Sequence, residues 1–368
     1  MVRDNPPVAT GVGNPTGLRG GKADDPSLSS ETVKSADKTT SPTTIRAHKQ
    51  PSLIWLLISR VVLPLILLIG AAVGFVRIRA LLAPRVEVAN VVAQLRAGGQ
   101  ARWQAVAYLT PFIYDERYDD LRRDPVLATA LADSLAEELD QPVAGYSDMS
   151  IAARAHLCRM IRRMDVPAVI PCLVKAVRWR GGGSPELDSP VRKAAAEGLY
   201  QLGERLGPEV LRAYPEVLPA LLVAVDDPVD PVRSAAALAL GLHGGPEACD
   251  KLETLLGDPN PAVRYNAAIG LAMAGDAAGI AILEELFHSK ETEKLATTGN
   301  LESINGMRTR QLLVLGLRSV NRLMDMDPTA PVEDLRPVLN HLQYSLVPED
   351  VKQLAFQVEV KLNQRTVR

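Results

Sequence analysis

Two stretches of this chain, PVRSAAALALGLHG at 231–244 and AVRYNAAIGLAMAG at 262–275, have nearly the same pattern and lie 31 residues apart. A third stretch, PVRKAAAEGLYQLG at 190–203, is identical to the first at eight of its fourteen positions. Self-similarity at a fixed spacing of 20–50 residues is typical of repeat architectures. We therefore expect stacked copies of one unit rather than a single central core.

Each copy has the pattern of an amphipathic helix. Counted from its arginine (Arg192, Arg233 or Arg264), positions −1, +3, +4, +7 and +10 are mostly apolar and share one helix face at 100° per residue. The small residues midway allow a neighbouring helix to approach closely. Glycine at position +11 is predicted to end the helix, because it adopts the left-handed cap conformation without strain. These glycines are Gly203, Gly244 and Gly275, and a weaker copy starting at Arg310 has Asn321 there.

Composition favours an all-α protein. Of 368 residues, 47% are hydrophobic but only 4% are aromatic, and no convincing alternating strand pattern occurs outside an apolar segment near residue 60. The formal net charge is −2, and residues 77–368 are net negative. Nucleic-acid binding requires a basic surface to neutralise phosphates, so we expect no nucleic-acid partner.

Three zones follow one another along the chain. Residues 1–50 are rich in Ser, Thr, Pro and Gly, with too few large apolar residues to offset the entropy of ordering, so a disordered polar tail is predicted. Residues 53–76, LIWLLISRVVLPLILLIGAAVGFV, are long enough to cross a bilayer and are predicted to be a transmembrane helix. Residues 86–363 form the repeat region, followed by a short tail, 364–368.

The orientation of the predicted span is left open. Basic residues within twenty positions number three before the central apolar run and four after it. They are Arg46, Lys49 and Arg60 before it, and Arg77, Arg79, Arg85 and Arg96 after it. This balance, with cysteines that show no pairing pattern, favours a cytoplasmic repeat region. Keeping a fifty-residue polar tail on the inner side favours the reverse.

The repeat region reads as seven helical pairs. The first begins at residue 86, and the others are predicted at 125–164, 166–205, 209–244, 246–275, 277–325 and 331–363, with Asp-Pro or Gly-Gly turns between many of the helices. Two insertions, 179–190 and 288–307, read as surface loops.

This pattern resembles the HEAT repeat, in the short variety also seen in phycobilin lyases, and the resemblance covers about 86–363. The layout of polar tail, apolar span and repeat region is similar to that of bacterial membrane-anchored HEAT proteins. The resemblance implies a curved α-solenoid, second helices on its inner surface, a bacterial inner-membrane location and a protein-binding role. Asp188 and Asp230 match the Asp…Val-Arg part of the motif, which implies that they cap the second helix and pair between repeats.

No catalytic motif is evident in the sequence. HEAT-like deoxyhypusine hydroxylases hold iron with His-Glu pairs, and none of the five histidines here is followed by Glu. Cys158, Cys172 and Cys249 are far apart and read as buried apolar residues. His156 and Cys158 lie about 200° apart on one helix and cannot form one metal face. We therefore expect no enzymatic activity, metal or cofactor, and we interpret the tryptophans as packing residues.

A partner surface is predicted opposite the apolar face of the second helices. Counted from the arginine of each copy, position +5 points in this direction and position +9 lies nearby. In the later repeats these positions are apolar instead of polar. We name this set the apolar stripe: Glu197, Leu238, Leu242, Ile269, Met273 and Leu315. Exposed apolar patches usually mark interaction sites. The alternative is that these positions are buried, either because the helical phase is shifted by one residue or because a loop such as 288–307 folds over them. The leading hypothesis is a membrane-anchored scaffold that binds a protein; the alternative is a lyase-like or chaperone-like subunit that handles a small chromophore or other ligand.

Overall fold

The computed structural model describes residues 60, 62–81, 86–141, 148–181 and 183–366. The predicted disordered tail, the start of the predicted span (53–59 and 61) and residues 367–368 lie outside the described residues. The chain divides into two units, Met1–Ala83 and Pro84–Arg368, and each is described by itself.

The first unit contains one described helix, α2 (Leu63–Leu81). Its large apolar side chains between Leu63 and Phe75 are exposed, with Leu68 reaching 69%. Among the residues described, no helix meets both the length and the apolar character needed to cross a membrane. The predicted span begins before this helix and stays a prediction.

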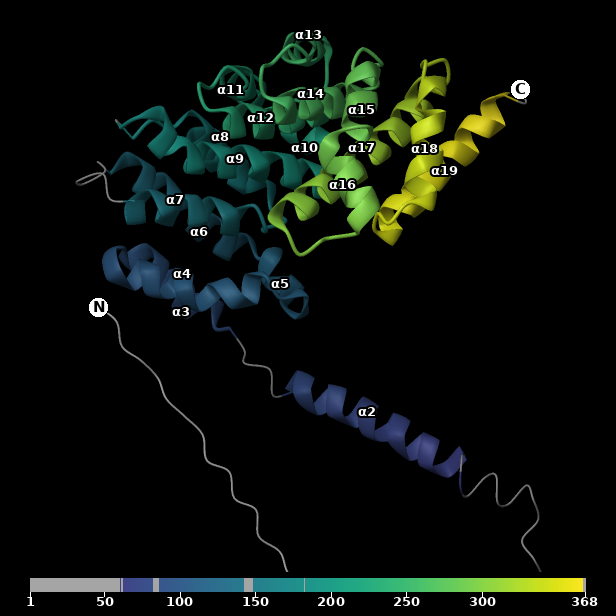
Figure 1. Cartoon of the computed structure of the whole chain (residues 1–368). Coiled ribbons are helices and arrows are strands. Elements are labelled where there is room, and N and C mark those ends of the chain that lie inside the picture. Colours follow the sequence, from purple (N-terminus) through teal and green to yellow (C-terminus); the bar gives the residue numbers. More distant parts are fainter. Residues whose placement is uncertain (1–59, 61, 82–85, 142–147, 182, 367–368) are drawn as a thin grey trace, which may run out of the picture. The chain divides into compact units, whose positions relative to one another are not determined.

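The second unit is built from helices, and no strand occurs among its described residues (Figure 1). Among the residues that the structure describes in this unit, seven helical pairs follow one another, as the turn pattern predicts. They are α3 (Val88–Ala97) with α4 (Gly99–Ile113), α6 (Pro125–Asp140) with α7 (Asp148–Ile161), α8 (Ile170–Arg178) with α9 (Pro185–Leu206), α11 (Val217–Ala224) with α12 (Asp230–His243), α13 (Pro246–Leu255) with α14 (Pro261–Ala274), α15 (Ile280–Phe287) with α17 (Ile304–Met326), and α18 (Arg336–Tyr344) with α19 (Glu349–Thr366). Short helices α5 (Asp119–Arg122) and α10 (Pro208–Arg212) connect successive pairs, and α16 (Lys290–Thr298) lies between α15 and α17.

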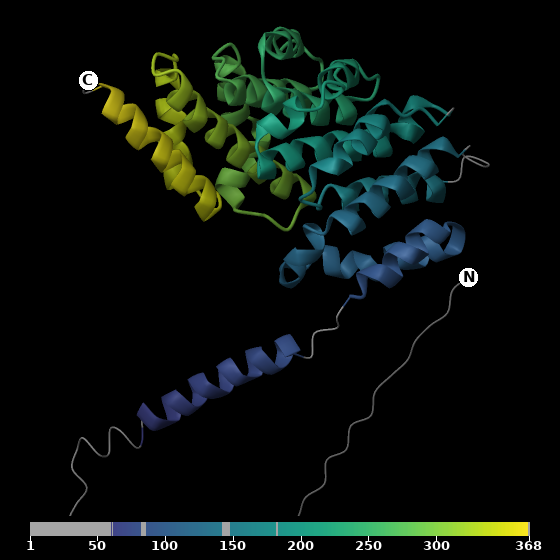
Figure 2. The same ribbon diagram turned by 180° about the vertical axis from the view of Figure 1, so that it is seen from behind.

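The second helices of successive pairs form a continuous row. Helix α9 packs against α12, α12 against α14, and α14 against α17. Figure 1 shows α11 and α13 on one side of α9, α12 and α14, and Figure 2 shows the same stack from behind. The second helices contact one another more extensively than α8, α11 and α13 do. The second-helix row is therefore the more closely packed layer of the stack.

Small residues bring the second helices together, as the sequence predicts. A Cβ atom added to Gly241 of α12 would lie 2.1 Å from the Cα of Gly270 in α14. No side chain fits at that position without moving the two backbones apart. The two helices therefore pack backbone to backbone, and the apolar faces of both are buried.

The predicted helix ends are correct for two copies and wrong for two. Helix α12 ends at Gly244, with φ 68°, and α14 ends at Gly275, with φ 91°. Helix α9 continues past Gly203 to Leu206. Gly203 instead lies where the side chains of Leu211 and Leu242 leave no room for a Cβ. Helix α17 likewise continues past Asn321 to Met326.

Both predicted surface loops are partly helical. Residues 185–190 form the first turns of α9, because a proline at the first helical position and acidic residues in the first turn favour helix initiation. The 288–307 segment contains α16, which Ser289 caps by accepting a hydrogen bond from the Thr292 N–H, and the start of α17. The sequence prediction gave too much weight to the polarity of these segments.

Candidate functional site

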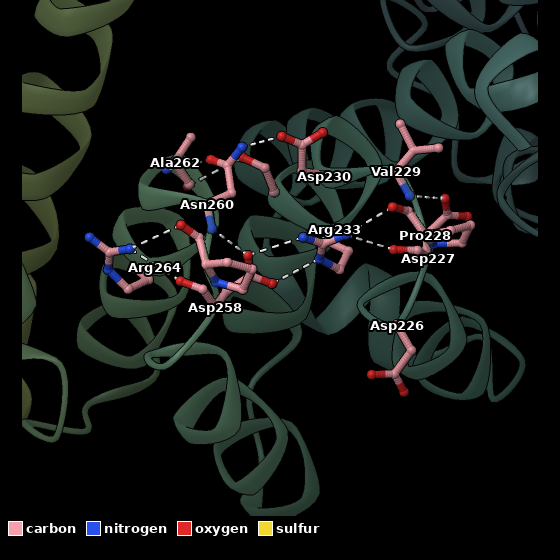
Figure 3. Close-up of polar contacts among 12 residues, drawn as sticks. Asp226, Asp227, Pro228, Val229, Asp230, Arg233, Asp258, Asn260, Ala262 and Arg264 are labelled. Carbon is pink, nitrogen blue, oxygen red and sulfur yellow. Dashed lines mark hydrogen bonds and ion pairs between the residues drawn. The ribbon is translucent and has the colours of Figure 1, made fainter.

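Ion pairs join the second helix of one repeat to the turn of the next. Arg192 of α9 donates from Nε to Asp227 Oδ2 at 2.7 Å and from Nη2 to Oδ1 at 3.0 Å. Arg233 of α12 makes the same two bonds to Asp258, at 2.8 and 3.0 Å (Figure 3). We call these two pairs the Asp–Arg ladder. Arg264 continues it with a bond of 2.6 Å to Glu285.

Each Asp-Pro turn of the ladder is held by two consecutive arginines. The Asp227 carboxylate binds Arg192, while its backbone oxygen accepts a bond of 2.9 Å from Nη1 of Arg233 (Figure 3). Arg264 and Asp258 repeat that second bond at 3.1 Å. These carboxylates also accept the backbone N–H two residues later, at 3.0 and 2.8 Å. The ladder fixes the spacing between repeats.

Burial and bonding have opposite effects on the Asp258 carboxyl. Burial favours its neutral form, but the hydrogen bond from Arg233, the Asn260 N–H and the arginine charges outweigh this, so the pKa of Asp258 lies below its usual value. The ladder therefore holds Asp258 ionised in the folded protein.

The roles expected for Asp188 and Asp230 are only partly correct. Asp230 does join neighbouring repeats, since it accepts a hydrogen bond from the Asn260 side chain (Figure 3). Neither aspartate caps its helix: both lie inside the first turn, and Asp188 accepts from the Gly181 N–H at 2.7 Å. The partners of the arginines are the Asp-Pro aspartates, whose carboxylates face the preceding repeat. Their recurrence before the helix could have indicated this role.

The apolar stripe is not an exposed surface, which corrects one expectation. Ile269 has 0% exposure, and Leu242 and Met273 are buried. Leu238 and Leu315 are partly buried against the core, and Glu197 is half-buried with ion pairs to Arg162 and Lys193. A helical wheel treats one helix alone, whereas α14 is flanked by both α12 and α17. These neighbours cover positions that face outward on an isolated helix.

Three residues of that set nevertheless meet at one concavity. A pocket of about 160 Å³ opens on the second-helix row, and Leu242, Met273 and Leu315 from three different helices contribute to its wall. We call it the inner pocket. Its full lining is Tyr200, Gly203, Glu204, Pro208, Leu242, Met273, Leu315, Arg318, Ser319 and Arg322.

Polar side chains that the sequence analysis missed contribute the rest of the inner pocket. Arg318 and Arg322, one turn apart on α17, are exposed, and neither guanidinium makes a hydrogen bond or ion pair with any residue that the structure describes. Glu204 of α9 is exposed, whereas Tyr200 is buried to 8% exposure. Burial, followed by the charge of Glu204, raises the pKa of the Tyr200 hydroxyl, so Tyr200 stays neutral.

A second pocket, of about 190 Å³, lies at the opposite ends of α14 and α17. Pro261 and Leu312 contribute apolar surface, and Glu291 and Arg308 contribute one charge of each sign. Its charges balance, and none of the six stripe residues lines it.

The cysteines and histidines among the described residues form no evident catalytic or metal-binding site. Cys158 and Cys172 are buried, and burial raises the pKa of both thiols, for Cys158 to about 12. No group of three or more His, Cys, Asp or Glu in the described part of the chain could hold a metal ion. Trp179 packs in the core and donates from Nε1 to the Leu139 carbonyl at 3.0 Å, consistent with a packing role.

Comparison with known proteins identifies the repeats. The family model for HEAT repeats matches residues 139–240, 189–257 and 218–299, which include the three similar stretches. The chain is thus HEAT-like over that region. No curated protein matches it by sequence.

Two solved structures are similar in outline. The complex of CpcE and CpcF of phycocyanin lyase from Nostoc sp. PCC7120 has a TM-score of 0.45 and 17% identity, over 77% of this chain and 96% of that chain. Human deoxyhypusine hydroxylase in complex with glycerol has a TM-score of 0.24 and 18% identity, with the same two coverages. Neither similarity says what this chain binds.

Proposed function

We propose that this chain is a membrane-tethered, non-catalytic scaffold that binds a protein partner on the second-helix row. The observation that carries the proposal is the inner pocket, where apolar side chains lie beside two exposed arginines without partners among the described residues. Aromatic or apolar anchors surrounded by charge are typical of protein-binding surfaces. HEAT-type solenoids provide such concave surfaces.

The tether is residues 53–76, and its support is the character of the apolar run. In α2 the large side chains from Leu63 to Phe75 are exposed, and no charged residue occurs among them. So much exposed apolar surface is unfavourable in water and favourable in a lipid bilayer. Deletion of 53–76 should move the protein from membranes to the soluble fraction; retention on carbonate-washed membranes would refute the tether.

Position-specific photocrosslinking in cells tests the partner surface. Benzoylphenylalanine replaces Glu204 at the inner pocket and, as a control, Val223 of α11, which is 55% exposed on the first-helix layer. We expect discrete protein adducts from position 204 and few or none from position 223. Equal labelling from both positions, or no protein adducts at 204, would contradict the proposal.

The small-ligand alternative is tested on the same protein. Native mass spectrometry of the full chain would reveal a co-purified small molecule. A stoichiometric chromophore, lost when Leu315 is replaced by Trp to fill the inner pocket, would favour ligand handling over protein binding.

A further inference from the structure

The inner pocket combines two kinds of surface. Leu242, Met273 and Leu315 provide apolar contacts, and Arg318 and Arg322 provide guanidiniums. All of them line one space of about 160 Å³. An occupant that is complementary to both surfaces presents an apolar group and an anion together.

The charges of the pocket are unbalanced. Two arginines line it against one carboxylate, Glu204. Like charges one turn apart on a helix repel each other, and Glu204 is the one carboxylate that lines the pocket with Arg318 and Arg322. Bidentate guanidinium bonds to a carboxylate would remove that repulsion and add strong charge-assisted hydrogen bonds.

We propose, on the basis of the proposed function, that the inner pocket binds the free C-terminus of the partner polypeptide and that the last residue of this partner is apolar. In a C-terminal residue the carboxylate and the side chain share one Cα, so a single residue can meet both the arginines and the apolar wall that line this one space. An internal Asp or Glu carries its carboxylate on the side chain and needs a second residue for the apolar contacts.

Synthetic peptides test this without knowledge of the partner. The probes are Ser-Gly decapeptides ending in Ala, Val, Leu or Phe, each made as the free acid and as the amide. Binding to the full chain in lipid nanodiscs is measured by saturation-transfer NMR, which detects millimolar affinities. The free acids ending in Leu or Phe should bind. The affinity of their amides should be lower by at least about tenfold, since a hydrogen bond to a charged group contributes a free energy of that size.

A double variant and a matched control assign the effect to the arginines. Arg318→Gln with Arg322→Gln should weaken binding of the Leu free acid by about 10- to 100-fold. Arg308→Gln removes another exposed arginine of α17 that lies in the second pocket, so affinity should be unchanged. The circular dichroism spectra of both variants should match the wild type, because all three side chains are exposed.

Four outcomes would overturn the proposal. They are equal binding of acid and amide, equal loss in the Arg308 variant, tighter binding of an amidated peptide with an internal Glu, and absence of binding by every free acid. If crosslinks from position 204 persist in that case, the C-terminus proposal fails while the scaffold proposal stands.

Discussion

Replacing Asp227 by Ala should weaken the junction between two repeats far more than replacing its neighbour, Asp226. Asp227 and its partner Arg192 each have 0% side-chain exposure. Asp227→Ala removes both bonds to Arg192, a contact of 3.2 Å with Arg180 and the acceptor of the Val229 N–H. Arg192 is then left as a buried, uncompensated charge, which typically costs about 3–5 kcal/mol.

Asp226 is the matched control, because it precedes Asp227 directly and points elsewhere (Figure 3). Its carboxylate is 63% exposed and pairs with Lys251 at 2.7 Å. Exposed pairs of this kind contribute less than about 1 kcal/mol. Asp226→Ala should therefore be nearly neutral.

Amide hydrogen exchange of the full chain is the assay, because it reports the local opening of a repeat junction. A loss of 3–5 kcal/mol should speed exchange in α9 and α12 by about 10²- to 10⁴-fold in Asp227→Ala, while Asp226→Ala stays near the wild type. Replacing the pair by Arg192→Met and Asp227→Leu should restore most of the protection, since apolar pairs often substitute for buried ion pairs. Equal exchange in the two single variants would refute the role assigned to the ladder.

Three further predictions follow from the same contacts. Gly241→Ala should destabilise the protein by about 1–3 kcal/mol or more in urea unfolding, because its Cβ would meet α14, whereas Gly257→Ala, with its nearest contact at 3.8 Å, should not. The pKa of Asp258 is lower in the folded protein, so its stabilising contribution is complete above the unfolded value of about 3.9 and is lost as pH falls through the folded value. Asp258→Asn should thus flatten the stability–pH curve below about pH 4 and leave it unchanged in shape at neutral pH; an unaltered acid limb would contradict this. At pH 8 a thiol reagent should modify the half-buried Cys249 first, and the two buried cysteines should react only after unfolding. Mass spectrometry of the labelled chain gives the order of modification, and earlier labelling of either buried cysteine would contradict this prediction.

The repeat pattern was sufficient to predict the helical pairs. Apolar spacing around Arg233 and Arg264 gives the buried face of α12 and α14, and the glycines that follow end both helices. The pattern of a single helix does not reveal what its neighbours cover. Ile269 points away from the core of its own pair, yet α12 and α17 flank its helix and bury it.

The inner pocket could be predicted only in part. Leu242, Met273 and Leu315 were selected by their direction on the helix, and they do share the pocket. Arg318 and Arg322 lie at positions +8 and +12 from Arg310, on the same side of the helix, and a pattern that selects apolar residues does not include them. That α9 and α17 both line one pocket depends on the curvature of the stack, which no local pattern encodes.

The most direct test of the account is an amide-exchange footprint of the full chain with and without the partner identified by crosslinking. If the second-helix row is the binding surface, protection should increase at the C-terminal ends of α9, α12 and α14 and in the adjoining part of α17. Exchange in α8, α11 and α13 should be unchanged. Protection confined to those first helices, with none around the inner pocket, would contradict the central claim.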